Sequence, residues 1–272
     1  MAISIIVCSR NKDNLQFILN SINQTIGVEY EVLHSLHAGQ IGLAKTYNNL
    51  AQAAKFPILV FMHDDLIFQD KNWGIRIIEI MKNEKIGLIG LMGTVYKSKY
   101  ISIWTSCDKS LFRNASISNG EVNCQKVAVV DGCFMAISKI CFSKVKFDES
   151  FQGFHGYDLD YSLAVNELFD VVVATNIKYD HLSPGIKNEE WYKDVTYVHK
   201  RWDRLLPLSI CKISNKIKNL SEYYSLCDEF NSVMNFDIRK IHLFKLYLKM
   251  LLFYFRYNRL KYTRTIFNII FT

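Results

Sequence analysis

Two acids that directly follow an apolar run are the residues of this chain best suited to bind a metal ion. Residues 58–62 (ILVFM) have the composition of a buried strand, and His63, Asp64 and Asp65 come next. In an open α/β sheet, side chains at the carboxyl end of a strand face the ligand crevice. Carboxylates at this place could hold a divalent cation and, through it, a phosphate. A solvated turn is the alternative, because Asp is common in turns.

A second pair of acids, Asp158 and Asp160, stands just before a helix predicted over residues 161–168. Capping of that helix explains one acid well, since free backbone amides and the helix dipole stabilise a carboxylate there. The pair also follows an aromatic loop flanked by glycines. A carboxylate held in such a loop could act as a general base that takes a proton from an attacking hydroxyl.

His181 follows the last clear strand, predicted over residues 170–175, and precedes a turn. At the end of a strand it can reach the same edge of the sheet as Asp65, and an imidazole with a carboxylate suits Mn²⁺ or Mg²⁺. A structural or solvated histidine is the alternative. His63 is a weaker candidate ligand, because a residue in its position can simply hydrogen-bond to the backbone.

The elements that must position these residues alternate between strand and helix. Strands are predicted at residues 2–9, 30–34, 58–62, 86–91, 126–130, 133–138 and 170–175, and helices at 14–23, 43–54, 73–82 and 161–168. This order predicts an α/β fold with a doubly wound, mostly parallel sheet. The turn with Ser9, Arg10 and Asn11 then lies at the carboxyl end of the first strand, although Arg10 could equally be a surface charge.

Residues 93–127 break this regular pattern. They are polar, aromatic and rich in serine, which is the composition of a variable loop or hairpin region over a site. Regular structure returns with the two strands on either side of a turn at Asp131 and Gly132.

Composition favours one packed, enzyme-sized domain with an extension. Half of the 272 residues are hydrophobic and only three are proline. Seven cysteines, odd in number and never spaced as CxxC, are typical of reduced thiols rather than of disulfides or zinc sites. Residues 1–8 lack the features of a signal peptide, and no apolar run has the length of a membrane span. We therefore expect a cytoplasmic protein.

Positive charge is concentrated at the C-terminal end and marks a domain boundary. Residues 197–272 carry 14 Lys/Arg against five Asp/Glu, whereas residues 1–196 carry 19 against 21. We expect a catalytic domain over 1–196, without a nucleic-acid-binding surface, and a basic helical extension over 197–272. The basic and aromatic composition of residues 235–272 predicts an amphipathic helix. This helix could bind an anionic membrane surface, pack on its own domain, or pair with a second copy in a homodimer.

Taken in order, these segments resemble the family 2-type GT-A glycosyltransferases, and most closely the subgroup named after the streptomycin-biosynthesis protein StrF. The resemblance spans about residues 2–185. It rests on the first strand with Arg10, on LVFMHDD at 59–65, VDGCFMA at 130–136, FDESF at 147–151, and HGYDLDYS at 155–162 with Asp180 and His181 after it.

The resemblance implies transfer of a sugar from a nucleotide-sugar donor, with a UDP-sugar favoured, and an Mn²⁺ or Mg²⁺ ion on the diphosphate. Asp65 matches the metal-binding acid that ends the family's DxD-like motif, and Asp64 the acid beside it. His181 matches a late histidine that reaches the metal or diphosphate. The positions expected to bind the nucleotide-sugar are Ser9, Arg10, Asn11, Asp64, Asp131 and His155.

Asp158 matches the catalytic base in the family's Glu-Asp pair, with Asp160 as the base if the alignment shifts by two residues. The chain departs from the family pattern at His63, where many relatives carry an acid, and at Tyr157, which replaces the Glu. The departure at His63, which the StrF-like subgroup tolerates, leaves open how the ribose and the sugar are held, and Tyr157 leaves the first half of the Glu-Asp motif unfulfilled. One base without a singled-out covalent nucleophile implies displacement with inversion.

Two alternatives are a sugar nucleotidyltransferase and an inactive GT-A-like scaffold that binds membrane and partner enzymes. The first normally has a glycine-rich phosphate loop after its first strand, and the SRNK segment at 9–12 lacks glycine. Retention of Asp65 and Asp158 counts against the second. For the transferase we expect a saccharide or lipid-linked acceptor, as in assembly of a bacterial surface polysaccharide or glycoconjugate.

Overall fold

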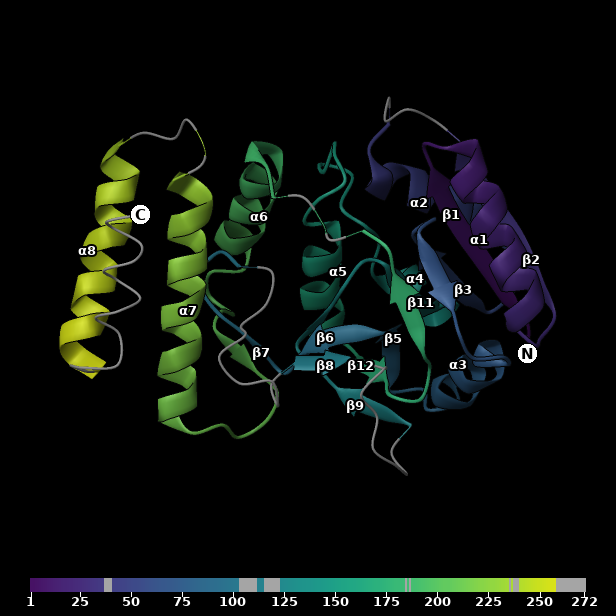
Figure 1. The fold of residues 1–272 in the computed structure, drawn as a ribbon. Coiled ribbons are helices and arrows are strands. Elements are labelled where there is room, and N and C mark those ends of the chain that lie inside the picture. Colours follow the sequence, from purple (N-terminus) through teal and green to yellow (C-terminus); the bar gives the residue numbers. More distant parts are fainter. Residues whose placement is uncertain are drawn as a thin grey trace.

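A computed structural model of the chain describes residues 1–36, 41–102, 112–114, 123–183, 185, 187–234, 236 and 240–257. Its centre is a seven-stranded sheet in the order β2-β1-β3-β11-β5-β12-β9 (Figure 1). The strands are β1 (Ile3–Ser9), β2 (Tyr30–Leu36), β3 (Ile58–Met62), β5 (Ile86–Gly90), β9 (Cys124–Lys126), β11 (Phe134–Ser138) and β12 (Asp170–Ala174). Five strands run one way, while β11 and β9 run antiparallel to their neighbours. The predicted α/β fold with a mostly parallel sheet is confirmed.

Side chains alternate between the two faces of the sheet and build two hydrophobic layers. On β3, Val60 and Met62 join one layer, whereas Leu59 and Phe61 join the other. The first layer contains α1 (Lys12–Thr25) and α3 (Trp73–Met81), and the second contains α2 (Leu43–Ala53), α4 (Lys139–Lys144) and α5 (Tyr157–Asn166). Because both faces are covered, the central strands are apolar throughout, as their sequences predict.

The region predicted as a loop or hairpin over residues 93–127 contains short strands. In its described part, β6 (Met92–Thr94) pairs with β8 (Phe112–Asn114) and with β10 (Val129–Val130), and β7 (Tyr96–Lys97) pairs with β14 (Leu208–Ser209). The strand predicted over 126–130 is divided between β9 and β10. The rest of the region, residues 103–111 and 115–122, lies outside the described residues.

Three helices follow the sheet: α6 (Glu189–Arg201), α7 (Asn215–Met234) and α8 (Lys240–Tyr257). In Figure 1, α7 and α8 lie side by side at the end of the molecule opposite β2. Buried residues of both, among them Leu226 and Leu246, belong to the same hydrophobic layer as α2 and α5. The predicted boundary between residues 196 and 197 falls inside α6, and the extension shares the core of the preceding domain. None of the described helices is long and apolar enough to cross a membrane.

The cysteines of the described residues are free thiols, as expected from their spacing. Cys107 lies outside the described residues.

Candidate active site

A cavity of about 610 Å³ lies at the carboxyl ends of β1 and β3. Eight of the ten predicted site residues line it: Arg10, Asn11, Asp64, Asp65, Asp131, His155, Asp158 and His181. The other two, Ser9 and Asp160, are buried and are not among the lining residues.

Strand register explains why these distant residues meet. β1 and β3 run in parallel with Val7 opposite Met62, so the turns after both strands lie at one edge. β11 is antiparallel to β3 and pairs Phe134 with Met62, which puts the residues before β11 beside the residues after β3. The backbone amide of His63 extends this ladder by donating to the carbonyl of Cys133 at 2.9 Å.

His181 reaches Asp65 through a small separate sheet. β13 (Tyr179–His181) pairs antiparallel with β4 (Leu66–Phe68), with His181 opposite Leu66. The backbone amide of Leu182 donates to the carbonyl of Asp65 at 3.1 Å, which fixes the two segments next to each other. The sequence distance of more than a hundred residues is thereby closed by a few backbone bonds.

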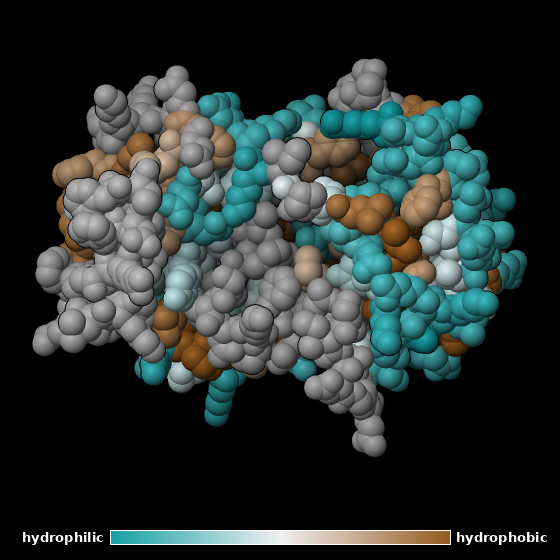
Figure 2. All heavy atoms as spheres, in the orientation of Figure 1, coloured by the Kyte–Doolittle hydropathy of each residue, from teal (hydrophilic) through white to brown (hydrophobic). Residues whose placement is uncertain are grey.

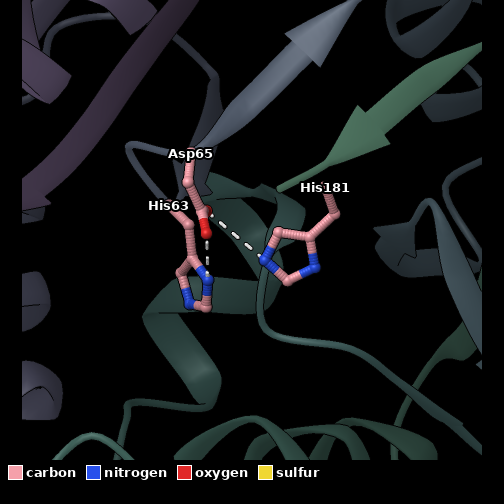
Figure 3. Close-up of side chains that lie close together, drawn as sticks. All are labelled: His63, Asp65 and His181. Atoms are coloured by element: carbon pink, nitrogen blue, oxygen red, sulfur yellow. Dashed lines mark ion pairs between the residues drawn. The ribbon is translucent and has the colours of Figure 1, made fainter. Parts of the chain in front are cut away.

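A carboxylate and two imidazoles face one another at this point, as Figure 3 shows. Oδ1 of Asp65 lies 3.3 Å from Nε2 of His181 and 4.0 Å from Nδ1 of His63. The ligand atoms of the three residues all lie within 4.8 Å of one another. Asp131, Cys133 and His181 form a second group of this kind, but the thiol of Cys133 is fully buried, and burial raises its pKa well above the ordinary value.

The chemistry of the first group fits a divalent cation. Oδ1 of Asp65 and Nε2 of His181 are both buried and form no hydrogen bond of regular geometry, and Oδ1 of Asp65 is held only by its ion pairs with the two imidazoles. The Asp65 carboxylate raises the pKa of His181, while burial lowers the pKa of His63. Burial works against ionisation of Asp65, but the two imidazoles outweigh it and lower the pKa of that carboxyl. One anionic oxygen and imidazole nitrogens are ligands that Mn²⁺ accepts.

Asp64 faces the turn after β1. The hydroxyl of Ser9 contacts its carboxylate, and the backbone amide of Asn11 donates to that hydroxyl at 3.0 Å. Asn11 also caps α1, since its side chain accepts from the amide of Asp13 at 2.7 Å. The Ser9 hydroxyl therefore connects the Asp64 carboxylate to the backbone of the turn, although Ser9 does not line the cavity.

Arg10 and His155 also line the cavity and interact electrostatically. The guanidinium of Arg10 lies 3.7 Å from the centre of the Phe154 ring, so a flat cationic surface covers the aromatic side chain. His155 is half-buried next to it, and burial lowers the pKa of its imidazole. Arg10 is exposed and also lines the cavity, so its position is compatible with both predicted alternatives, a surface charge and a binding residue.

The two acids at the start of α5 have different surroundings. The helix begins at Tyr157, four residues before the predicted start, and places both acids in its first turn. Asp158 lines the cavity, and its carboxylate accepts from the backbone amide of Gly132 at 3.0 Å. Burial, with a further contribution from Asp131, raises the pKa of Asp158 to about 6. Asp160 instead faces Trp202 and Arg201.

Sequence reasoning missed several residues of the cavity. Tyr157 lines it, with its hydroxyl 3.0 Å from Nε2 of His63. Cys8, Tyr47, Phe154, Asn188, Glu190 and Trp191 also line the cavity. The last three lie at the start of α6, which was not predicted. The signal was present: Asn188 is a typical N-cap, and Trp191, Val195 and Val198 have helical spacing.

Residues 4–200 match the sequence profile of the protein family described as "Glycosyltransferase like family". No curated protein matches the chain. Among solved structures, the chain is similar to S. aureus TarS 1–349 in complex with UDP-GlcNAc, with 12% identity, a TM-score of 0.45, and coverage of 96% of this chain and 75% of that one. It is also similar to S. aureus TarS 1–349 alone, with 10% identity, a TM-score of 0.46, and coverage of 96% of this chain and 74% of that one.

Proposed function

The chain belongs to the glycosyltransferase-like family, and on that premise we propose that it transfers a sugar from a nucleoside-diphosphate sugar to an acceptor hydroxyl. The observation that carries the proposal is the joint position of two separate acids in one cavity. Asp65 stands with His181 and His63 in a group suited to a cation, and Asp158 is a half-buried carboxylate that lines the same cavity and does not belong to that group. A metal-dependent sugar transferase needs a cation site for the diphosphate and a separate carboxylate that accepts the proton of the acceptor hydroxyl.

In the proposed reaction, Asp65 and His181 hold Mn²⁺ or Mg²⁺. When bound, the ion supplies positive charge for the diphosphate leaving group. Asp64, supported by Ser9, accepts hydrogen bonds from the ribose hydroxyls. Arg10 and Asn11 hold the nucleotide at the end of β1, and Asp131 and His155 contact the donor sugar. A UDP-sugar is the first donor to be tested.

Asp158 takes the proton from the acceptor hydroxyl as that oxygen forms its bond to the anomeric carbon. A carboxyl with a pKa of about 6 is ionised at neutral pH, yet is basic enough to accept a proton in the transition state. Cys8 is a cysteine that lines the cavity and could in principle act as a nucleophile. Burial and the Asp64 charge raise the pKa of its thiol to about 12, so the thiol is not ionised at neutral pH. A single displacement with inversion therefore fits better than a covalent intermediate.

The acceptor is proposed to be a saccharide or a lipid-linked saccharide, in assembly of a bacterial surface polysaccharide or glycoconjugate. The outer face of α8 supports a site at the membrane. Phe244, Leu248 and Leu252 are 60%, 42% and 68% exposed and recur every four residues, so they form one apolar stripe. Figure 2 shows hydrophobic residues at the edge of the molecule where α8 lies.

Charge makes an anionic bilayer the proposed partner of this stripe. Lys245 and Lys249 are exposed on the same helix, and no Asp or Glu occurs after Asp237. The other face of α8, with Leu246 and Met250, is buried against the protein, so the helix can present its stripe without leaving its own domain. Basic residues beside an apolar stripe are typical of helices that lie in the headgroup layer. A second copy of the chain is the competing occupant.

A thermal-shift panel tests the proposed donor class. UDP-, GDP-, CMP- and TDP-sugars are added to the full chain with and without Mn²⁺. We expect one nucleoside diphosphate sugar to raise the unfolding temperature, and to do so more with the ion present. If a nucleoside triphosphate and a sugar phosphate raise the unfolding temperature and the diphosphate sugars do not, the result would favour the nucleotidyltransferase. No response to any nucleotide would favour the inactive scaffold.

A further inference from the structure

The two positions at which the chain departs from the family pattern touch each other. His63 replaces the common acid and Tyr157 replaces the common Glu, and the hydroxyl of Tyr157 lies 3.0 Å from Nε2 of His63. These residues come from different elements, the end of β3 and the first turn of α5. The contact indicates that the two departures work together.

The partners of Tyr157 determine which nitrogen of His63 carries the proton. The hydroxyl of Tyr157 also lies 3.2 Å from the carbonyl oxygen of Gly132, which can only accept a hydrogen bond. The hydroxyl donates to this carbonyl, and the Tyr47 side chain is a further hydrogen-bond partner of Tyr157. With the hydroxyl proton on Gly132, the oxygen of Tyr157 accepts from Nε2 of His63, so this arrangement favours the tautomer with the ring proton on Nε2.

This tautomer leaves the lone pair of His63 on Nδ1. That atom lies 4.0 Å from Oδ1 of Asp65, on the side where His181 also approaches the carboxylate (Figure 3). Nitrogen with a free lone pair is the form of imidazole that binds a metal, and a hydrogen bond from the other ring nitrogen is the usual way in which proteins orient such a ligand.

We propose that His63 is a third ligand of the cation, bound through Nδ1, and that Tyr157 is the residue that sets its tautomer and orientation. The inference deepens the proposed function, from which it takes the presence of a cation. His63, Asp65 and His181 would offer two nitrogens and one oxygen. Mg²⁺ prefers oxygen and retains its waters, so this set selects Mn²⁺ over Mg²⁺.

The surroundings of Tyr157 support a fixed orientation. Its side chain is 3% exposed, and its ring packs edge-on against Tyr47 with ring centres 5.9 Å apart. A side chain at Gly132 would collide with the Tyr157 hydroxyl and ring. Glycine at 132 therefore allows the tyrosine to reach both the carbonyl and the histidine.

Binding of Mn²⁺ without nucleotide, followed by electron paramagnetic resonance, tests the role of Tyr157. In Tyr157→Phe only the hydroxyl is lost, and we expect the dissociation constant to rise about 10- to 100-fold, the usual effect of removing an outer-shell partner. Tyr161→Phe is the matched control, because that buried hydroxyl on the same helix bonds to the carbonyl of Val145 at 3.2 Å, away from the cavity. Its dissociation constant should stay within about twofold of the wild-type value.

Nitrogen NMR of histidine in the metal-free wild type reads the tautomer without any variant. We expect His63 to be protonated at Nε2 and free at Nδ1. Protonation at Nδ1, or equal Mn²⁺ affinity of the Tyr157→Phe and Tyr161→Phe proteins, would overturn the assignment. Neither measurement uses a nucleotide, so those results would leave the proposed sugar transfer standing. Conversely, absence of any nucleotide response would overturn the transfer and leave this cation site intact.

Discussion

The indole nitrogen of Trp202 donates a hydrogen bond of 2.8 Å to Oδ1 of Asp160, and Nε of Arg201 lies 3.5 Å from the same oxygen. Asp160 is thereby engaged with α6 and the segment after it, at 3% exposure. Asp158, two residues earlier, lines the cavity. The first turn of α5 thus separates the two acids: Asp158 lines the cavity, and Asp160 contacts the end of α6 and the residue after it.

Replacement of each acid by its amide should separate these roles. Asp158→Asn removes the proposed base, so we expect the initial rate of transfer to fall about 10²- to 10⁴-fold. Asp160→Asn keeps an oxygen for Trp202 and should retain a rate within about threefold of wild type. Both variants are measured at saturating donor. If the rate of transfer falls in Asp160→Asn and stays at the wild-type level in Asp158→Asn, the base is Asp160.

The pH dependence of turnover should report Asp158. The acid must be ionised to accept a proton, so turnover should decline as pH falls through about 6 and reach a plateau above it. The measurement is kcat from pH 5 to 8.5 at saturating donor and cation. A profile that is flat through pH 6 would contradict the assignment of Asp158 as the base.

Stability should change in the opposite sense to activity at the same residue. The folded state raises the pKa of Asp158 from its ordinary 3.8 to about 6, so the unfolded chain loses this proton at lower pH than the folded one. Above pH 6, ionisation of Asp158 therefore lowers the free energy of unfolding by at most about 3 kcal/mol. This destabilisation disappears towards pH 4, where the acid is protonated in the folded state. Asp158→Asn should therefore unfold several degrees higher than wild type at pH 8 and with little difference at pH 4. A lower unfolding temperature at pH 8 would show that the charge is compensated.

The stripe on α8 predicts selective binding to anionic vesicles. Wild type should sediment with phosphatidylglycerol vesicles more than with phosphatidylcholine vesicles, and high salt should weaken this binding. The double replacement Leu248→Glu with Leu252→Glu should reduce binding at least about tenfold, because it places two acids in the apolar layer. Ile140→Glu is the matched control, since Ile140 is 61% exposed on α4.

A different result would support the competing occupant of α8. If the protein is a dimer in solution and the double replacement makes it a monomer without changing vesicle binding, the stripe is an interface between two copies of the chain. Molar mass measured by light scattering distinguishes the two.

Local patterns were sufficient to predict the central sheet. β1, β3 and β5 are continuous apolar segments, and the alternation of strands with helices predicted a mostly parallel order. Polar residues at strand ends, the acid at the start of a helix, and the resemblance to the glycosyltransferase family together identified eight lining residues of the cavity. These predictions succeeded because strand ends in such folds converge on one edge whatever the detailed register.

Contacts between segments distant in sequence were beyond such reasoning. The orientation of Asp160 depends on Trp202, which is 42 positions away, and the pairing of Tyr157 with His63 spans 94 positions. α7 lies within the helical extension predicted over 197–272, but its bounds and its buried face were not predicted, because that face carries Ser and Glu among its apolar residues, for example Ser225 and Glu229. The Glu229 carboxylate accepts from the amide of Ile101 at 3.2 Å, a partner that periodicity cannot reveal.

Equilibrium binding of the donor, measured by calorimetry with and without Mn²⁺, tests the central claim most directly. For the nucleotide-sugar selected by the thermal-shift panel, wild type should bind at least about tenfold more tightly with the ion present. Asp65→Asn should lose that enhancement, whereas Asp158→Asn should keep it while losing turnover. Donor affinity that is independent of Mn²⁺, or unchanged in Asp65→Asn, would contradict the account of this cavity as the site of cation-assisted sugar transfer.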